Sequence, residues 1–261
     1  MPFLNRGTYQ LYYEVIGRGK PLVFLHGLGG SVEQIKNIYY SIPNIQLIVM
    51  DQQGHGRSTA NMKNLSFAQM AKDVIALADA LGLDTFYLAG ISMGAAVSIK
   101  TKLLFSNRIT KLVLIRNAWI NFPMSDRFVN LYASVADYLA HNDLHGFINT
   151  EAFCQLKKES HHAAESFVHY FYDEASLHYY EKYKILPKTS PIEQSEELSS
   201  ILCQTLILAN FNDPIHPYTY SEFIAKQLSQ STLYEIESKD IDQEKHKNQI
   251  NTHLKAFLLS K

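Results

Sequence analysis

The chain lacks most of the features that would indicate a metal, redox, membrane or nucleic-acid protein. Its 261 residues include two cysteines, Cys154 and Cys203, whose separation fits no metal or redox motif. We therefore expect both to be free, buried thiols. No apolar run approaches the ~20 residues that a membrane helix needs. A formal net charge of -1 gives no electrostatic reason to expect a nucleic-acid or membrane partner.

The N-terminus also lacks the pattern of a secretory signal. Residues 1–7 contain no charged stretch that leads into an apolar run, so a cytosolic location is the expectation. In contrast, 46% of the residues are hydrophobic, enough for a substantial buried core. The length fits one large α/β domain or a core with a modest insertion.

The clearest candidate site is the sequence Gly90-Ile91-Ser92-Met93-Gly94. A strand-like apolar run over residues 85–89 precedes it, and a helix-like segment follows from residue 95 to about 105. A serine on a sharp strand-to-helix turn needs strained dihedrals and small neighbours, which explains the two glycines. Ser92 would project from this turn as a nucleophile. The Met93 amide would lie at a helix N-terminus, where it can stabilise a developing oxyanion.

Together with two further motifs, this stretch resembles the hallmarks of the α/β-hydrolase fold superfamily. The motifs are the glycine-rich segment 22–30, which contains His26 and Leu28, and segment 51–58, which reads Asp-x-x-Gly-His-Gly-x-Ser. The chain departs slightly from the family at Gln53, often arginine, and at Ala95, often glycine. The resemblance implies an α/β fold with a mostly parallel, doubly wound sheet. It also implies the Leu28 amide as a second oxyanion donor beside Met93.

The remaining apolar pattern predicts alternating strands and helices, hence a parallel sheet with helices on both faces. The segment 8–16 is expected as a hairpin leading into the strand 21–26. Further strands are expected at 45–50, 111–116, 205–210 and 232–236, and helices at 67–81, 220–228 and 244–259.

Residues 118–195 break this alternation. They contain no convincing strand, yet hold 14 of the 31 aromatic residues and six of the eleven histidines. The resemblance implies a helical cap at 118–195, inserted into a core formed by residues 1–117 and 196–261. Candidates to line an apolar substrate pocket are aromatic residues of this segment such as Trp119 and Phe122, and also Phe128, Phe167, Tyr170 and Phe171. Most cap aromatics should instead pack the cap onto the core. The cap histidines have no carboxylates at convincing ligand positions, so no metal site is expected.

A serine nucleophile requires a histidine base to remove its proton, and the histidine requires a carboxylate that accepts its other N–H and orients the ring. In this family the chain order is nucleophile, acid, histidine. Asp213 follows the expected strand 205–210 and is therefore the candidate acid. Asp240 and Asp242 are alternatives, although they fall in the loop that should carry the base.

The candidate base is His246, at the start of the last helix. The alternative, His253, lies seven residues further on and beside the core-facing stripe, so a packing role is expected for it. Lys245 and Lys247 flank His246, and their charges would disfavour the imidazolium unless they point into solvent.

The resemblance therefore implies a serine hydrolase with the triad Ser92, Asp213 and His246. Its reaction would be cleavage of an ester, thioester or lactone through an acyl-serine intermediate, without metal or organic cofactor. The cap aromatics favour a small to medium apolar acyl group in a small-molecule substrate. Alternatives are a carbon–carbon bond hydrolase or a perhydrolase of the same fold, and a slow-turnover ligand receptor that retains the triad.

Overall fold

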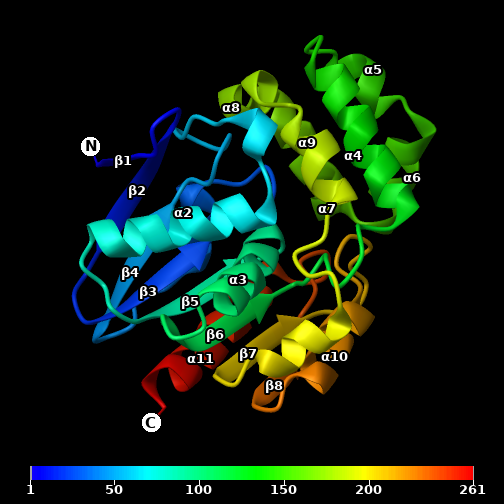
Figure 1. Ribbon diagram of the computed structural model, residues 1–261. Helices are drawn as coiled ribbons and strands as arrows, with labels where there is room; N and C mark the ends of the chain where they lie inside the picture. Colours follow the sequence, from blue (N-terminus) through cyan, green and yellow to red (C-terminus); the bar gives the residue numbers. More distant parts are fainter. Residues whose placement is uncertain (1, 261) are drawn as a thin grey trace.

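An eight-stranded, mostly parallel sheet forms the centre of the fold in the computed structural model, which describes residues 2–260 (Figure 1). The strands are β1 (Phe3–Asn5), β2 (Gln10–Ile16), β3 (Lys20–Leu25), β4 (Ile45–Met50), β5 (Phe86–Ile91), β6 (Ile109–Ile115), β7 (Gln204–Ala209) and β8 (Ser231–Glu235). Their order is β1-β2-β4-β3-β5-β6-β7-β8. Only the β1–β2 and β2–β4 pairs are antiparallel. The segment 8–16, expected as a hairpin, instead holds the single strand β2, and the first strand of the β1–β2 hairpin lies before that segment. The expected sheet is confirmed.

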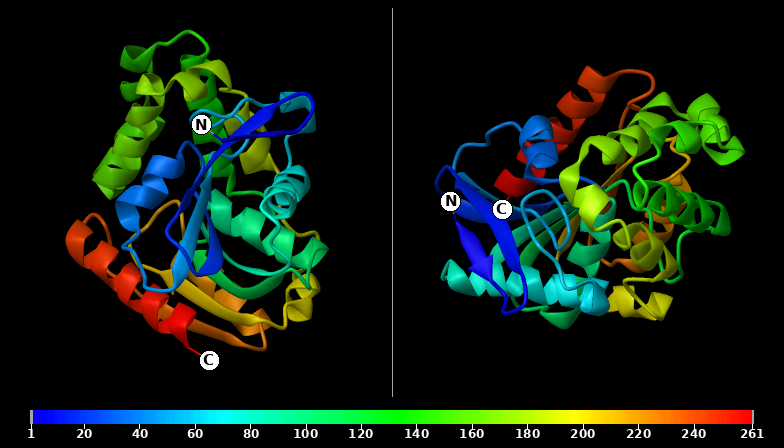
Figure 2. Two further views of the ribbon diagram at one scale, coloured as in Figure 1. Left: turned by 90° about the vertical axis from the view of Figure 1, so that its left-hand side faces the viewer. Right: turned by 90° about the horizontal axis from the view of Figure 1, so that it is seen from above.

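Helices cover both faces of this sheet. Helices α2 (Phe67–Ala80), α3 (Met93–Leu104) and α10 (Tyr218–Gln227) pack on one face, and α1 (Val32–Ile38) and α11 (Gln243–Leu259) on the other (Figures 1 and 2). Along β3, Leu22 and Phe24 belong to the core on the α1 and α11 side. Val23 and Leu25 belong to the core on the α2 and α3 side. Burial on both faces explains why the central strands are continuous apolar runs.

The segment between β6 and β7 is helical and gathers over one end of the sheet (Figures 1 and 2). It contains α4 (Asp126–Leu139), α5 (Leu144–Ile148), α6 (Glu151–Glu159), α7 (His161–His169), η2 (Tyr170–Tyr172), α8 (Glu174–His178), α9 (Lys182–Ile185), η3 (Leu186–Lys188) and η4 (Ser195–Ser200). The short helix η1 (Met62–Asn64) lies between β4 and α2. Many of the aromatic side chains of α4 to α9 pack on one another, as Phe147 does on Phe153, Phe167 and Phe171.

Both cysteines are free, but the expectation that they are buried is wrong. Helix α6 buries Phe153 and Leu156, and Cys154 lies on its opposite, exposed side. Cys203 is only partly buried. Within residues 2–260 no helix is both long enough and apolar enough to cross a membrane. The cytosolic location stays a prediction.

Candidate active site

Ser92 occupies a strained turn between β5 and α3. Its backbone has φ 54° and ψ −113°, outside the regions that most residues adopt. The end of β5 and the start of α3 approach each other so closely that a Cβ on Gly90 would lie 2.1 Å from the Gly94 carbonyl carbon. A Cβ on Gly94 would lie 2.3 Å from the Leu25 carbonyl oxygen. The two glycines are therefore required by packing, and the turn holds the Ser92 side chain at the wall of a cavity.

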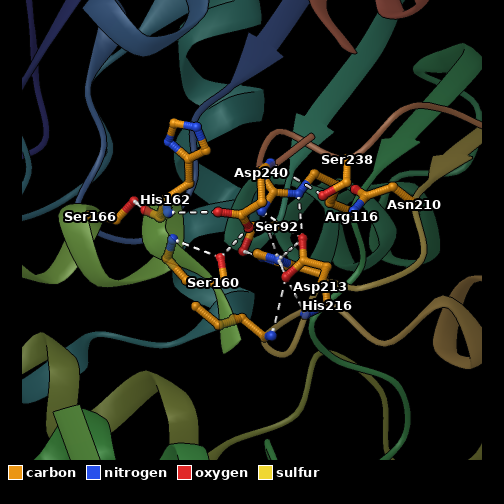
Figure 3. Close-up of polar contacts among 12 residues, drawn as sticks. Ser92, Arg116, Ser160, His162, Ser166, Asn210, Asp213, His216, Ser238 and Asp240 are labelled. Atoms are coloured by element: carbon orange, nitrogen blue, oxygen red, sulfur yellow. Dashed lines mark hydrogen bonds and ion pairs between the residues drawn. The ribbon is translucent and has the colours of Figure 1, made fainter. Parts of the chain in front are cut away.

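The Ser92 hydroxyl is hydrogen-bonded to His216 (Figure 3). Its Oγ lies 2.8 Å from His216 Nε2, and His216 Nδ1 lies 2.9 Å from both carboxylate oxygens of Asp213. The side chains of His216 and Asp213 are only 8% and 4% exposed. Asp213 Oδ1 also accepts the backbone N–H groups of Ile215 and His216, which closes a short turn after β7. This turn presents an acid and a base three residues apart.

His246 does not contact Ser92, in contrast to the expectation from the sequence. It lies within the first turn of α11, and its Nδ1 is 2.6 Å from the Glu237 carbonyl oxygen. Its buried Nε2 has no hydrogen-bond partner among the described residues. Burial, together with the charges of Arg116 and Lys239, lowers the pKa of His246 to about 4. The structure therefore brings together Ser92, Asp213 and His216, and leaves His246 outside this chain of hydrogen bonds.

The other candidates from the C-terminal region have structural contacts. Asp240 accepts hydrogen bonds from the Ser160 hydroxyl and the His162 backbone N–H, and so joins the β8–α11 loop to the start of α7. Asp242 caps α11 by accepting the Lys245 N–H. His253 stacks on Tyr234 with ring centroids 4.2 Å apart. Asp213 is thus the one candidate acid that contacts a histidine next to Ser92.

Arg116 shares the Asp213 carboxylate with His216. It follows β6 with a left-handed φ of 54°. Its Nε donates to Asp213 Oδ2 at 2.8 Å, and its Nη2 forms an ion pair with the same oxygen at 2.6 Å. Burial alone would raise the pKa of Asp213, but the charges of Arg116 and His216 outweigh it and hold that pKa far below its ordinary value. Burial lowers the pKa of His216; the Asp213 charge opposes this effect and the Arg116 charge adds to it. Asp213 is therefore ionised and His216 neutral near pH 7.

Two backbone N–H groups near Ser92 are free to bind an oxyanion. Neither the Leu28 nor the Met93 amide donates a hydrogen bond within residues 2–260. Met93 is the first residue of α3, where N–H groups have no intrahelical acceptor. The loop of Leu28 is fixed on both sides, because Gln34 accepts the Gly27 N–H and Tyr170 donates its hydroxyl to the Leu28 carbonyl.

A cavity of about 370 Å³ opens above Ser92. From the helices between β6 and β7 it receives two aromatic side chains, Tyr132 and Tyr170, alongside mostly polar groups. Of the expected lining residues, Tyr170 reaches the cavity, and Trp119 and Phe122 do not. Trp119 is buried against Phe67, and Phe122 is 45% exposed and packs against Tyr220. The cavity is therefore lined by polar and apolar groups in about equal measure, and not mainly by aromatic side chains.

Two histidines of α7 have local partners. His161 and His162 both pair with Glu165 on α7, and His162 also contacts Gln243. Among the residues that the structure describes, no group of three or more His, Cys, Asp or Glu side chains could hold a metal ion.

Comparisons with known proteins agree with the fold. The alpha/beta hydrolase fold family matches residues 20–246. A putative carbamate hydrolase RutD from Azorhizobium caulinodans is 30% identical over 46% of this chain and 45% of its own length, so that alignment spans less than half of the relative. The Variovorax paradoxus protein of the same name is 26% identical over 86% of each chain. An esterase from Exiguobacterium antarcticum superimposes with a TM-score of 0.80 at 19% identity, over 99% of both chains. The family match covers most of the sequence, and the chain belongs to the alpha/beta hydrolase fold family.

Proposed function

We propose that the protein is a serine hydrolase that cleaves an ester, thioester or lactone of a small molecule. The observation that carries this proposal is the continuous chain of hydrogen bonds from Ser92 Oγ through His216 to Asp213. Neither a structural serine nor a packing histidine needs this arrangement, which is the one that activates a hydroxyl for nucleophilic attack. Relatives named as a putative carbamate hydrolase and an esterase support the same reaction class.

In the proposed reaction His216 is the general base. With its Nδ1–H donated to Asp213, its Nε2 accepts the Ser92 proton as Oγ attacks the substrate carbonyl carbon. The Leu28 and Met93 amides stabilise the oxyanion that forms. His216 then protonates the leaving group, and an acyl-serine remains. A water molecule, deprotonated by His216, releases the acid and restores Ser92.

The test combines covalent labelling with turnover of esters of graded acyl length. Wild-type protein should react with a fluorophosphonate at Ser92 and hydrolyse at least one ester series. The Ser92→Ala protein should lose labelling completely, and Ser92→Ala and His216→Ala should each lose on the order of 10⁴-fold or more in turnover. Ser106→Ala, at an exposed serine outside the cavity, is the matched control.

The histidine variants decide which imidazole is the base. With a neutral ester, the loss in His216→Ala should exceed the loss in His246→Ala by at least two orders of magnitude, because only His216 contacts Ser92. Equal turnover by folded Ser92→Ala and wild-type proteins would refute the proposal. Labelling without turnover of any ester would instead favour a ligand receptor that retains the triad.

A further inference from the structure

A second cavity lies beside the one above Ser92. Its volume is about 310 Å³, and it shares five lining residues with the first: Gln34, Ile91, Arg116, His162 and Lys239. The remaining lining comes from α1, the end of β6 and the first turns of α11. A substrate held at Ser92 can therefore extend into this second cavity.

The second cavity is positively charged. Arg116, Lys239 and Lys247 line it, and no aspartate or glutamate does. Arg116 is already neutralised by Asp213. Lys247 lies against the Tyr40 ring, with Nζ 4.8 Å from the ring centroid. Such a one-sided charge distribution favours an anion in the cavity.

Lys239 is the least compensated of these cations. It is partly buried between the two cavities, and its ammonium group makes no hydrogen bond or ion pair with any group of residues 2–260. Asp213 and Asp240 lie near enough to offset part of its charge, but neither contacts it directly. Asp240 accepts from Ser160 and His162, and Asp213 accepts from Arg116 and His216. Burial and the neighbouring Arg116 charge lower the pKa of Lys239 to about 8, so it is still mainly protonated at pH 7.

We propose that the second cavity binds a carboxylate of the substrate, with Lys239 as its principal partner. This inference rests on the proposed function, because it assumes an ester or related carbonyl held at Ser92. A carboxylate matches this site because Lys239 is the unpaired cation at the junction of the two cavities, whereas Arg116 is already paired with Asp213. The substrate is thus an acid ester, with its carboxylate a few bonds from the reacting carbonyl.

The kinetic test compares two esters of equal acyl length at pH 7, 4-nitrophenyl hemiglutarate and the neutral 4-nitrophenyl pentanoate. Wild-type kcat/KM should be about tenfold or more higher for the hemiglutarate, as expected for one charge-assisted hydrogen bond. Lys239→Met should remove this preference, mainly through KM for the acid ester. Lys239→Arg should retain most of it, and Lys72→Met, at an exposed lysine outside both cavities, should keep the wild-type ratio.

A binding measurement separates this inference from the proposed reaction. The Ser92→Ala protein should bind glutarate, but not glutaramide, by titration calorimetry, and Lys239→Met should abolish that binding. Binding of this kind without any ester turnover by the wild type would refute the hydrolase and leave the carboxylate site standing. Ester turnover with no preference for the acid ester, or a preference that survives in folded Lys239→Met, would overturn the carboxylate site.

Discussion

At the scale of single residues, Arg116 sets the conditions under which His216 can act as a base. Its Nη2 lies 3.2 Å from His216 Nδ1, the atom whose proton Asp213 must accept. A guanidinium can only donate, so it favours the opposite tautomer, in which Nδ1 carries no proton and Nε2 cannot accept from Ser92. It also neutralises the carboxylate that would otherwise stabilise the imidazolium. Arg116 is a positioning residue that makes His216 a weaker base.

Replacing Arg116 should therefore shift the pH profile of the reaction. Removal of the cation in Arg116→Met raises the pKa of His216, so the imidazole stays protonated to a higher pH. Because only neutral His216 accepts the Ser92 proton, the acidic limb of kcat/KM for a neutral ester should move to higher pH.

The matched control is Arg127→Met, which removes the Arg127–Glu159 surface pair on the cap. Arg127→Met should leave the acidic limb of the kcat/KM profile at the wild-type pH. A purely structural role for Arg116 would lower activity at every pH without moving the limb, and that outcome would contradict the assignment.

The sequence identifies Ser92 and Asp213 as neighbours in space, but it does not identify the histidine between them. Motif spacing places a serine on a strand-to-helix turn, and the position after β7 places an acid near it. The family order predicts that the base lies on the loop after β8, which contains Lys239 but no histidine. That absence, together with an Asp-Pro-Ile-His turn at 213–216, is the signal for His216. Chain order alone could not show that this turn reaches back to Ser92.

At the scale of elements, the core strands and long helices are predictable because each carries a complete periodic pattern. Strands buried on both faces are continuous apolar runs, and α11 repeats Ile250, Leu254 and Leu258 at helical spacing. Apart from α4, the helices between β6 and β7 are short, and several have five or fewer residues, so periodicity does not define which side faces the cavity. This is why the sequence offers Trp119, Phe122 and Tyr170 alike as lining residues, although only Tyr170 lines the cavity.

The contact between η2 and the Leu28 loop joins the cap to the proposed oxyanion site. A Cβ on Gly29 would lie 2.1 Å from the Tyr170 ring, so the ring rests directly on the backbone of that loop. The Tyr170 hydroxyl donates to the Leu28 carbonyl at 3.2 Å, and its ring stacks on Tyr183. The position of the Leu28 amide thus depends on an element of the cap.

Removing this one hydroxyl should loosen the loop without unpacking the cap. Tyr170→Phe keeps the ring contacts and loses the hydrogen bond, so the free energy of unfolding should fall by about 1 kcal/mol. Turnover should fall by about tenfold through kcat, because misplacement of an oxyanion donor raises the barrier more than it weakens binding. Tyr172→Phe, in the same short helix but 72% exposed, is the matched control. Unchanged kcat in Tyr170→Phe would show that the cap does not hold the oxyanion loop.

At the scale of the whole molecule, several buried histidines are kept neutral. His26 and His55 pack together with ring centroids 5.0 Å apart, and both are fully buried. His26 Nε2 accepts the Gln52 N–H, and Nδ1 is 2.8 Å from the Gly27 carbonyl, which ties two glycine-rich loops together. Burial lowers the pKa of His26 to about 4 and places that of His55 well below its ordinary value.

The buried histidines should make the folded state sensitive to acid. His26 and His246 each have a folded-state pKa of about 4, against about 6.5 when unfolded, so the unfolded chain binds more protons between these values. Stability is then lost as the pH falls through this window. Between pH 7.5 and 5.0, each of these two histidines lowers the free energy of unfolding by about 2 kcal/mol. Asp51 opposes them, because burial raises its pKa to about 6, and offsets about 1 kcal/mol.

Urea unfolding at pH 7.5, 6.0 and 5.0 measures this dependence directly. His26, His246 and Asp51 together should lower the free energy of unfolding by about 2–3 kcal/mol over the range, and His55 adds to this fall because its pKa is also held well below the ordinary value. His246→Gln should flatten the slope, because the replacement takes up no proton on unfolding. His145→Gln, at an exposed cap histidine, should leave the slope unchanged. A stability that stays constant or rises towards pH 5.0 in the wild type would show that these imidazoles are not held neutral in the folded chain, because Asp51 offsets only about 1 kcal/mol of their effect.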